Sequence, residues 1–355
     1  MRVTRRRLLA GAPLAASAPF AVMALSDAHA ADTHTMDGVL MSGEDMAGMH
    51  AAMIGDAVPA PDGPDRILQP PPAYEPGPVR SYELVATEKE IEVAKGVFYP
   101  AWAYGLAGEE ATVPGPTIRV TEGQRMRVRL LNASTHPHTI HFHGIHPANM
   151  DGVFEPVAPG DTFTYEFPAA PAGLHVYHCH ATPLKKHIAK GLYGALIIDP
   201  KTPRPPAQEL VMVMNGFDTN GDAANEFYTV NGRAFYYARH PVRVSRSRTV
   251  RIYLANLTEF DLINSFHLHG EFFRYYPTGT GDAFEYTDTV MLCQGQRGIV
   301  EIDFTHTGKF MFHAHQSEFA ELGWMGFFNV IDGDDAQPAA NRTFLCEQDE
   351  EPDTV

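Results

Sequence analysis

The sequence predicts an all-β protein made of two copies of one domain. From Tyr82 onward, short runs of Val, Ile, Thr, Tyr and Phe are separated by Gly, Pro, Asn and Asp. Alternating apolar residues between turn-forming residues are typical of β-strands. No long segment carries the apolar stripe of an amphipathic helix, so we expect a β-sandwich or barrel with few helices.

An internal repeat is the second observation. Residues Arg127–Asn132 followed by His141–Gly144 recur as Arg251–Asn256 followed by His267–Gly270, and the two histidine motifs stand 126 residues apart. Farther along each half, a glycine precedes another His-x-His pair by five residues. The Pro-rich segment 200–206 separates the copies and is typical of a stiff linker. We therefore predict domains at residues 81–200 and 207–335.

The composition restricts the possible functions. The chain has 355 residues, 44% of them hydrophobic and 20% charged, which excludes wholesale disorder and a fibrous protein. A formal net charge of -16 disfavours nucleic acid and anionic lipid as partners. Three cysteines cannot build a disulfide framework, although Cys293 and Cys346 either pair or remain free thiols. The unusual feature is the 18 histidines, which point to metal chemistry.

The first thirty residues predict export. Consecutive arginines at Arg5–Arg7 precede a moderately apolar stretch that reaches Leu25, and Ala28–Ala30 offers a small-residue cleavage site. This pattern is typical of a twin-arginine signal peptide. A glycine and two prolines interrupt the apolar stretch, which argues against a membrane anchor. We expect residues 1–30 to be removed from a periplasmic or secreted protein that does not insert into a membrane.

Two further segments lie outside the predicted domains. Residues 336–355 form an acidic tail, and residues 31–80 form a leader rich in Met, Gly, Ala and Pro without a sustained period. Thioether and imidazole groups favour soft copper ions. A flexible low-complexity linker explains the leader equally well. Its potential ligands are Met36, Met41, Met46, Met49, Met53, His34 and His50.

Four His-x-His pairs occupy equivalent places in the two halves. Residues two apart on a strand point to the same face, so each pair offers two imidazoles to one side. Eight imidazoles without a carboxylate argue against magnesium or calcium, and they exceed what one tetrahedral zinc needs. Imidazole suits copper, zinc and iron, so the pattern predicts a cluster of several ions. The pairs are His141 and His143, His178 and His180, His267 and His269, and His313 and His315.

A cysteine between two of these histidines predicts a second site. Cys179 lies between His178 and His180, so on a regular strand it points to the opposite face. With His138 and His187 it completes the thiolate and two imidazoles of a blue copper site. Leu192 occupies the axial position, where a carbon side chain cannot donate to a metal. We therefore expect a three-coordinate, relatively oxidising site.

These motifs resemble the four copper-binding motifs of the multicopper oxidases, a family that includes laccases, over residues 82–332. The resemblance implies two tandem cupredoxin-like Greek-key β-sandwich domains and four copper ions per protomer. Type 1 copper, at His138, Cys179 and His187, would take electrons from a small reductant. A trinuclear cluster of type 2 and type 3 copper, held by the eight paired histidines, would reduce dioxygen to water. His141 and His267 resemble the type 2 ligands.

The two-domain length resembles that of two-domain laccase-like members and of copper nitrite reductases. In such members the cluster closes between the first domain of one subunit and the second domain of the next, which implies a homotrimer. The expected reductants are phenols, aromatic amines or low-valent metal ions, and their identity is left open.

The second repeat lacks the type 1 ligands. Asn264 and Ala314 stand where His138 and Cys179 stand in the first repeat. Phe319 and Trp324 replace His187 and Leu192. One blue copper per chain, in the first domain, is therefore expected.

Two details of the motifs favour oxygen over nitrite as the acceptor. The resembling motifs of copper nitrite reductases carry Asp in place of His141 and Ala in place of His180, whereas this chain keeps both histidines. A copper nitrite reductase remains the enzymatic alternative. A non-catalytic copper-binding or resistance protein is the other alternative, for which the Met-rich leader is the main argument.

Three carboxylates are candidates for supplying protons. Asp151 resembles the acidic residue that assists oxygen reduction in the family, although an Asp before Gly152 also suits a turn. Glu318 and Glu321 follow His315 closely. They either relay protons or cap a loop.

Overall fold

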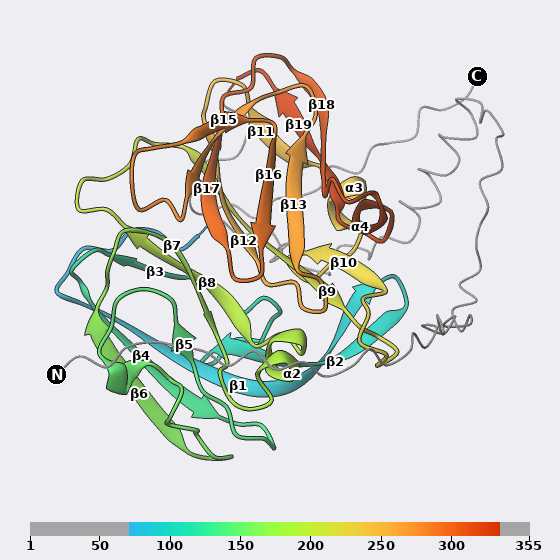
Figure 1. The fold of residues 1–355 in the computed structure, drawn as a ribbon. Coiled ribbons are helices and arrows are strands. Elements are labelled where there is room, and N and C mark those ends of the chain that lie inside the picture. The colour runs from blue at the N-terminus through green and yellow to red at the C-terminus, as the bar shows by residue number, and fades with distance from the viewer. Residues whose placement is uncertain (1–70, 334–355) are drawn as a thin grey trace, which may run out of the picture. The chain divides into compact units, whose positions relative to one another are not determined.

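The computed structural model describes residues 71–333, which form two β-sandwich domains in sequence (Figure 1). The first domain has sheets of strand order β2-β1-β4-β6 and β3-β8-β7-β5. Its short helices are η1 (Ala148–Met150) and α2 (Leu184–Ala189). Its strands are β1 (Val79–Ala94), β2 (Val97–Leu106), β3 (Ile118–Thr121), β4 (Arg125–Asn132), β5 (His141–Phe142), β6 (Thr162–Pro168), β7 (Gly173–His178) and β8 (Tyr193–Asp199).

The second domain repeats this plan with more strands. Its sheets have the orders β10-β9-β12-β17-β14-β15 and β11-β19-β18-β13-β16. Its short helices are α3 (Tyr236–Arg239) and α4 (Ser317–Glu321). Its strands are β9 (Gln208–Phe217), β10 (Phe227–Val230), β11 (Val242–Ser245), β12 (Val250–Asn256), β13 (Ile263–Leu268), β14 (Phe273–Pro277), β15 (Glu285–Thr287), β16 (Thr289–Cys293), β17 (Arg297–Ile302), β18 (Gly308–His313) and β19 (Met325–Ile331). The predicted all-β class with few helices is confirmed.

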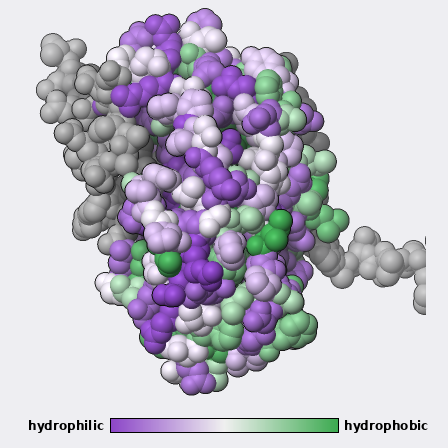
Figure 2. Space-filling view, turned by 90° about the vertical axis from the view of Figure 1, so that its left-hand side faces the viewer, coloured by the Kyte–Doolittle hydropathy of each residue, from purple (hydrophilic) through white to green (hydrophobic). Residues whose placement is uncertain are grey.

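Several predictions concern segments that the structure does not describe. The signal peptide at residues 1–30, the leader methionines and the acidic tail at residues 336–355 all lie outside the described range. Cys346 lies there as well, so its pairing with Cys293 stays a prediction. No helix within residues 71–333 is long and apolar enough to cross a membrane. The face in Figure 2 is mainly hydrophilic, with hydrophobic residues in separate groups.

The two domains share their strand pairing, as the sequence repeat predicts. β4 pairs in parallel with β1, and its counterpart β12 pairs in parallel with β9. β5 pairs antiparallel with β7 in a register that sets His141 opposite His178. The duplicate pairing of β13 with β18 sets His267 opposite His313. Each domain therefore brings the first histidines of its two pairs together across neighbouring strands.

Alternation decides which face of β4 is buried. Met126, Val128 and Leu130 are fully buried in the first-domain core, whereas Arg125 and Arg127 are exposed and pair with Glu166 on β6. Fully burying one such apolar side chain contributes about 1.5–3 kcal/mol. A shift of register by one residue would place the arginines in the core.

β8 is buried on both faces because it lies between two cores. Leu196 and Ile198 pack in the first-domain core. Tyr193 and Ile197 point the other way, into a cluster that includes residues of both domains. Second-domain members of that cluster are Val211, Val213, Phe217, Tyr253, Ala255, Leu257 and Ile299. An apolar core thus joins the two domains within the chain.

A charged network reinforces this junction. Arg119 on β3 lies 2.7 Å from Asp199 and 2.7 Å from Glu209 on β9. Arg251 on β12 lies 3.2 Å from Glu209 and 2.8 Å from Glu301. Burial by itself would raise the pKa of Glu209, but the hydrogen bonds from Arg119 and Tyr253 and the charges of Arg119 and Arg251 together outweigh burial, and the pKa is lowered. Glu209 is therefore ionised at neutral pH and holds one arginine from each domain.

We expect Glu209→Gln to lower the free energy of unfolding by about 2 kcal/mol, because charged hydrogen bonds to both arginines are lost. Urea denaturation at pH 7 measures the change. Glu83→Gln is the control, since Glu83 pairs with Arg129 at an exposed site and should cost less than about 1 kcal/mol. Equal costs for the two variants would contradict a structural role of the network.

Candidate metal centres

The predicted type 1 ligands lie together in the first domain. The Cys179 Sγ lies 3.2 Å from Nδ1 of His187 and 3.8 Å from Nδ1 of His138, and the two Nδ1 atoms are 3.2 Å apart. All three residues are buried. One thiol sulfur and two imidazole nitrogens converging in this way fit the donor set of a copper ion.

Different elements position these three ligands. His138 is held by a two-bond bridge to Val157, with N···O distances of 3.1 and 2.9 Å. Cys179 follows the last residue of β7, and its backbone N–H donates to the Leu192 carbonyl at 2.9 Å. His187 lies in α2. Leu192 is fully buried beside them, in the core that also contains Cys179.

Trp102 covers this site. Its ring centroid lies 5.3 Å from that of His138 and 4.8 Å from that of His187. The Trp102 ring centroid also lies 4.7 Å from that of His136 and 5.3 Å from Nζ of Lys186. No motif in the sequence singled out Trp102, because it is far from the histidine motifs along the chain.

The paired histidines form two separate groups, one in each domain. In the first domain, His143 Nε2 lies 3.2 Å from His178 Nε2, and the ring of His141 lies 5.2 Å from that of His178 and 5.5 Å from that of His180. Within residues 71–333, no close group of three potential ligands combines histidines of both domains.

The second domain repeats this arrangement. His269 Nε2 lies 2.9 Å from His313 Nε2, and the ring of His267 lies 5.3 Å from that of His313 and 5.2 Å from that of His315. The structure therefore brings together all eight paired histidines, four at a time.

One detail of the strand geometry differs from the prediction. β7 ends at His178 and β18 ends at His313, so the second histidine of these pairs lies just beyond its strand. The rings of His178 and His180 still stack at 6.1 Å. The two rings of each of these pairs therefore lie together although only the first histidine belongs to the strand ladder.

Backbone carbonyls fix the orientation of several rings. The Nδ1–H groups of His141 and His267 donate to the carbonyls of Asp151 and Asp288, both at 2.9 Å. His178 and His313 donate from Nδ1 to the carbonyls of the residues that follow them, at 3.0 and 2.6 Å. With Nδ1 as the donor, Nε2 keeps its lone pair for a metal.

The three candidate carboxylates have different surroundings. The Asp151 Oδ1 atom lies 3.0 Å from Nδ1 of His141 and 3.6 Å from Nε2 of His146. Spacing assigned His146 to no site, yet it stands beside Asp151. Glu318 and Glu321 are exposed on α4, and the described hydrogen bonds join neither carboxylate to a histidine. Their role as proton relays stays a prediction.

Arg297 is another residue that the sequence did not reveal. It lies on β17 of the second domain, but its guanidinium contacts the rings of His143 and His175 in the first domain at 3.1 and 3.2 Å. Burial lowers the pKa of Arg297. More than 120 residues separate Arg297 from either histidine, so no local pattern could have indicated the contact.

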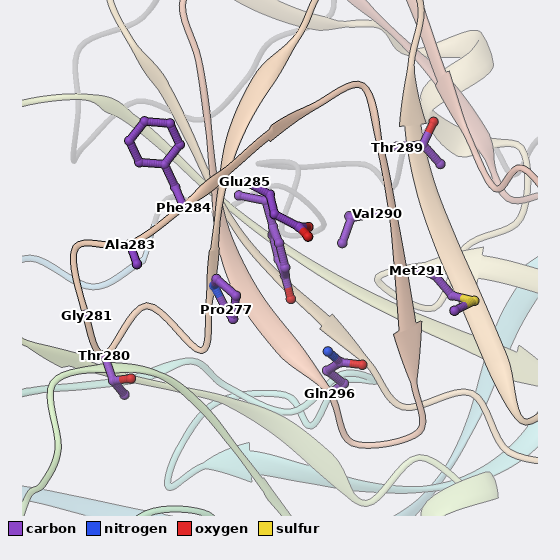
Figure 3. A pocket seen from close by; sticks show the side chains of 11 residues that line it. Pro277, Thr280, Gly281, Ala283, Phe284, Glu285, Thr289, Val290, Met291 and Gln296 are labelled. Carbon is purple, nitrogen blue, oxygen red and sulfur yellow. The ribbon is translucent and has the colours of Figure 1, made fainter.

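An open pocket of about 710 Å³ lies in the second domain, and Figure 3 shows the side chains that line it. Thr289 lines it and also contacts His267, with its Oγ1 2.8 Å from Nδ1. Phe284, Glu285 and Met291 are further lining residues, and all three are exposed. The pocket therefore adjoins the histidine group through Thr289.

Comparison with known proteins connects both domains with copper enzymes. Two family models described as multicopper oxidase match residues 98–203 and 203–334. A crystal structure of a multicopper oxidase is 54% identical, with a TM-score of 0.69, and the match covers 71% of this chain and 89% of that chain. The copper-containing nitrite reductase of Neisseria meningitidis is 30% identical over 269 residues, covering 69% of this chain and 68% of the relative.

A longer relative is the probable nitrite reductase-hydroxylamine oxidoreductase fusion protein of Kuenenia stuttgartiensis. It is 29% identical over 282 residues, which are 71% of this chain. The chain spans 31% of that relative's length.

Burial keeps several histidine rings of the first domain neutral. It lowers the pKa of His138, with help from the ring of His187, to about 4. Burial also lowers the pKa of His178 and of His175 to about 4 and that of His143 to about 3. In contrast, burial raises the pKa of the Cys179 thiol. At neutral pH these rings are therefore in the uncharged form that binds a metal.

The metal-free protein should lose stability as the pH falls from about 6.5 towards 4. In this window the unfolded chain protonates its histidines but the folded chain does not, so unfolding takes up protons. Relative to pH 7, we expect the free energy of unfolding at pH 5 to fall by roughly 1–2 kcal/mol per buried histidine. Urea denaturation after copper removal measures this loss. His175→Gln, outside the proposed ligand set, should flatten the pH dependence. A stability that stays constant between pH 7 and 5 would refute the neutral, buried state of these rings.

Proposed function

Because the chain belongs to the multicopper oxidase family, we propose that it oxidises phenols, aromatic amines or low-valent metal ions one electron at a time and reduces dioxygen to water. The carrying observation is the eight paired histidines beside one buried Cys–His–His group. When bound, copper supplies the one-electron chemistry at the thiolate site and the four-electron chemistry at the histidine cluster.

The chain itself joins the two kinds of site. Cys179 directs its sulfur to His138 and His187, while its neighbours His178 and His180 belong to the paired histidines. The three residues are consecutive, so two peptide units provide a covalent connection between the ligand groups. We propose that this connection carries the electrons and that no mobile carrier is needed.

The retained histidines support dioxygen rather than nitrite as the acceptor. The ring centroids of His141 and His180 lie 5.5 Å apart. An imidazole is therefore present in the first-domain group at both positions where the motifs of copper nitrite reductases carry Asp and Ala. A copper nitrite reductase is the second candidate, because a relative with that name is 30% identical. Nitrite turnover with a reduced dye in the absence of oxygen tests it. A copper-storage protein would hold colourless Cu(I) and consume no oxygen.

We propose that the complete cluster forms between subunits of a homotrimer. Each described histidine group belongs to one domain, and four imidazoles from one domain do not complete the proposed eight. Exposed apolar residues on neighbouring strands of the second domain support a covered surface: Ile263 on β13, the strand that carries His267, and Met291 on β16, which pairs with β13, are 41% and 62% exposed in the single chain. Export by the twin-arginine route to the periplasm or cell exterior remains a proposal that rests on residues 1–30.

Asp151 is proposed to hold and deliver protons beside His141. Its carboxylate oxygen Oδ1 lies 3.0 Å from Nδ1 of that ring, whose N–H donates to the Asp151 backbone carbonyl, so the carboxylate stands at the margin of the first-domain group. The neighbouring His146 ring packs against His141 with centroids 5.9 Å apart. Both residues thus stand where protons consumed in oxygen reduction would be needed.

Copper-loaded protein should contain four copper ions per chain and consume oxygen with a suitable donor. It should also be blue, with the visible absorption band typical of a thiolate–copper site. A substrate panel with oxygen uptake as the readout measures this. Cys179→Ser should remove the blue colour and almost all oxygen uptake, because the thiolate is lost. One copper per chain, or no oxygen uptake with every donor, would contradict the proposed function.

Asp151→Asn should slow oxygen reduction by roughly 100-fold, the usual size of a lost proton donor. Reduction of the blue copper in the absence of oxygen should keep its wild-type rate, since the type 1 ligands are untouched. Stopped-flow absorption separates the two steps, and copper content is measured in parallel. Glu318→Gln and Glu321→Gln, measured alongside, decide whether those exposed carboxylates relay protons. An unchanged rate in Asp151→Asn would exclude the proposed role of Asp151.

A further inference from the structure

Arg297 makes an unusual set of contacts across the domain junction. Its Nε donates to the Leu174 carbonyl at 3.1 Å and one terminal nitrogen donates to the Gly295 carbonyl at 3.3 Å. The terminal nitrogens also meet Nδ1 of His143 at 3.1 Å and Nδ1 of His175 at 3.2 Å. Among the described ion pairs, none joins Arg297 to a carboxylate. The guanidinium is therefore held by neutral acceptors, two of them imidazole nitrogens.

The guanidinium determines which ring nitrogen of each histidine carries a proton. An arginine has N–H donors and no acceptor, so each Nδ1 that it contacts must offer a lone pair. His175 agrees with this, because its Nε2 lies 2.8 Å from the Pro171 carbonyl and must donate there. His175 is thus fixed with Nε2 protonated and Nδ1 free to accept.

The same reasoning applies to His143, with a different consequence. When neutral and bonded to Arg297, His143 carries its proton on Nε2. That proton points at His178 Nε2, 3.2 Å away, which can accept because His178 donates from Nδ1 to the Cys179 carbonyl. The hydrogen-bond chain from Arg297 through His143 and His178 is consistent at every step. It leaves His143 without a lone pair on the nitrogen that faces the histidine group.

Other histidines of the two groups differ in this respect. His141, His178, His267 and His313 all donate from Nδ1 to a backbone carbonyl, so their Nε2 atoms carry a lone pair. His269 is the duplicate of His143, and no described hydrogen bond joins its ring to an arginine. The arginine contact is therefore a feature of the first-domain group and does not follow from the duplication.

We propose that Arg297 is a positioning residue that opposes copper binding by His143. This inference rests on the proposed assignment of His143 to the trinuclear cluster. To bind copper through Nε2, the ring releases its Nε2 proton and takes one up on Nδ1, so protons balance and no electron moves. The new Nδ1–H group then faces a guanidinium that can only donate, and the Arg297 hydrogen bond is broken. Copper binding in the first domain is thereby linked to the Gly295–Arg297 turn of the second.

Arg297→Gln tests the proposal because it removes the cationic donor. In a chelator titration of copper-loaded protein, the concentration that removes half of the non-blue copper should rise roughly tenfold, the size expected for one hydrogen bond to a charged group. The blue absorbance of the type 1 site is the internal reference and should respond as in the wild type. Arg204→Gln is the matched control, since half-buried Arg204 donates to the Gly279 carbonyl.

Equal or easier copper loss in Arg297→Gln would overturn the proposal and show that Arg297 supports the ligating geometry. If Arg297→Gln is too unstable to load, histidine ¹⁵N NMR of the metal-free wild type decides. His143, assigned with a His143→Gln variant, should show a proton on Nε2, and a proton on Nδ1 would overturn the proposal. A wild type that binds one copper per chain would instead refute the proposed function, so the two failures are distinguishable.

Discussion

The pairing of β5 with β7 is the constraint on which both metal-ligand groups depend. It sets His141 opposite His178 and so begins the first-domain histidine group. The next residue, Cys179, directs its sulfur into the domain core, where it contacts His138 and His187. A slip of this pairing by one residue would exchange the two sides of the strand and dissolve both groups at once. The duplicate pairing of β13 with β18 fixes the second-domain group in the same way.

Burial gives these ligands their chemical state. Imidazoles removed from water remain neutral, and carbonyl acceptors on Nδ1 select the ring nitrogen that stays available. The thiol is affected in the opposite direction, because burial disfavours its charged form and a cation is needed to stabilise the thiolate. The first-domain site thus combines ligands that are ready to bind with one that becomes ready only when a metal arrives.

Much of the fold and of the ligand set could be predicted from the sequence. Alternation and turn residues indicate strands, and spacing alone places His141 with His143 because both lie on one short stretch. The repeat then transfers the argument to His267 and His269. Residues that act from a distance along the chain could not be found in this way. Trp102 and Arg297 reach the sites only after the chain folds, since their contacts cross between β-strands or between domains.

His146 shows a different limit. It lies three residues beyond His143, but the spacing did not indicate its partner. The short helix η1 places Asp151 beside His146, with Oδ1 3.6 Å from Nε2. The strand expected for the pairs was also too regular, since β7 and β18 end at the first histidine of their pairs and the second histidine lies beyond the strand. The two rings of each pair nevertheless lie together, with centroids 6.1 and 6.0 Å apart.

The double-sided burial of β8 has a consequence for the folding of the chain. A polypeptide that stopped at Asp199 would leave Tyr193, Ala195 and Ile197 uncovered, together with the apolar side chains of β7 that share their cluster. Such a fragment would expose a hydrophobic sheet face to water and would aggregate or bind another protein through it. Although the amino-acid sequence repeats one domain, each copy therefore needs the other to bury its share of the common core during folding.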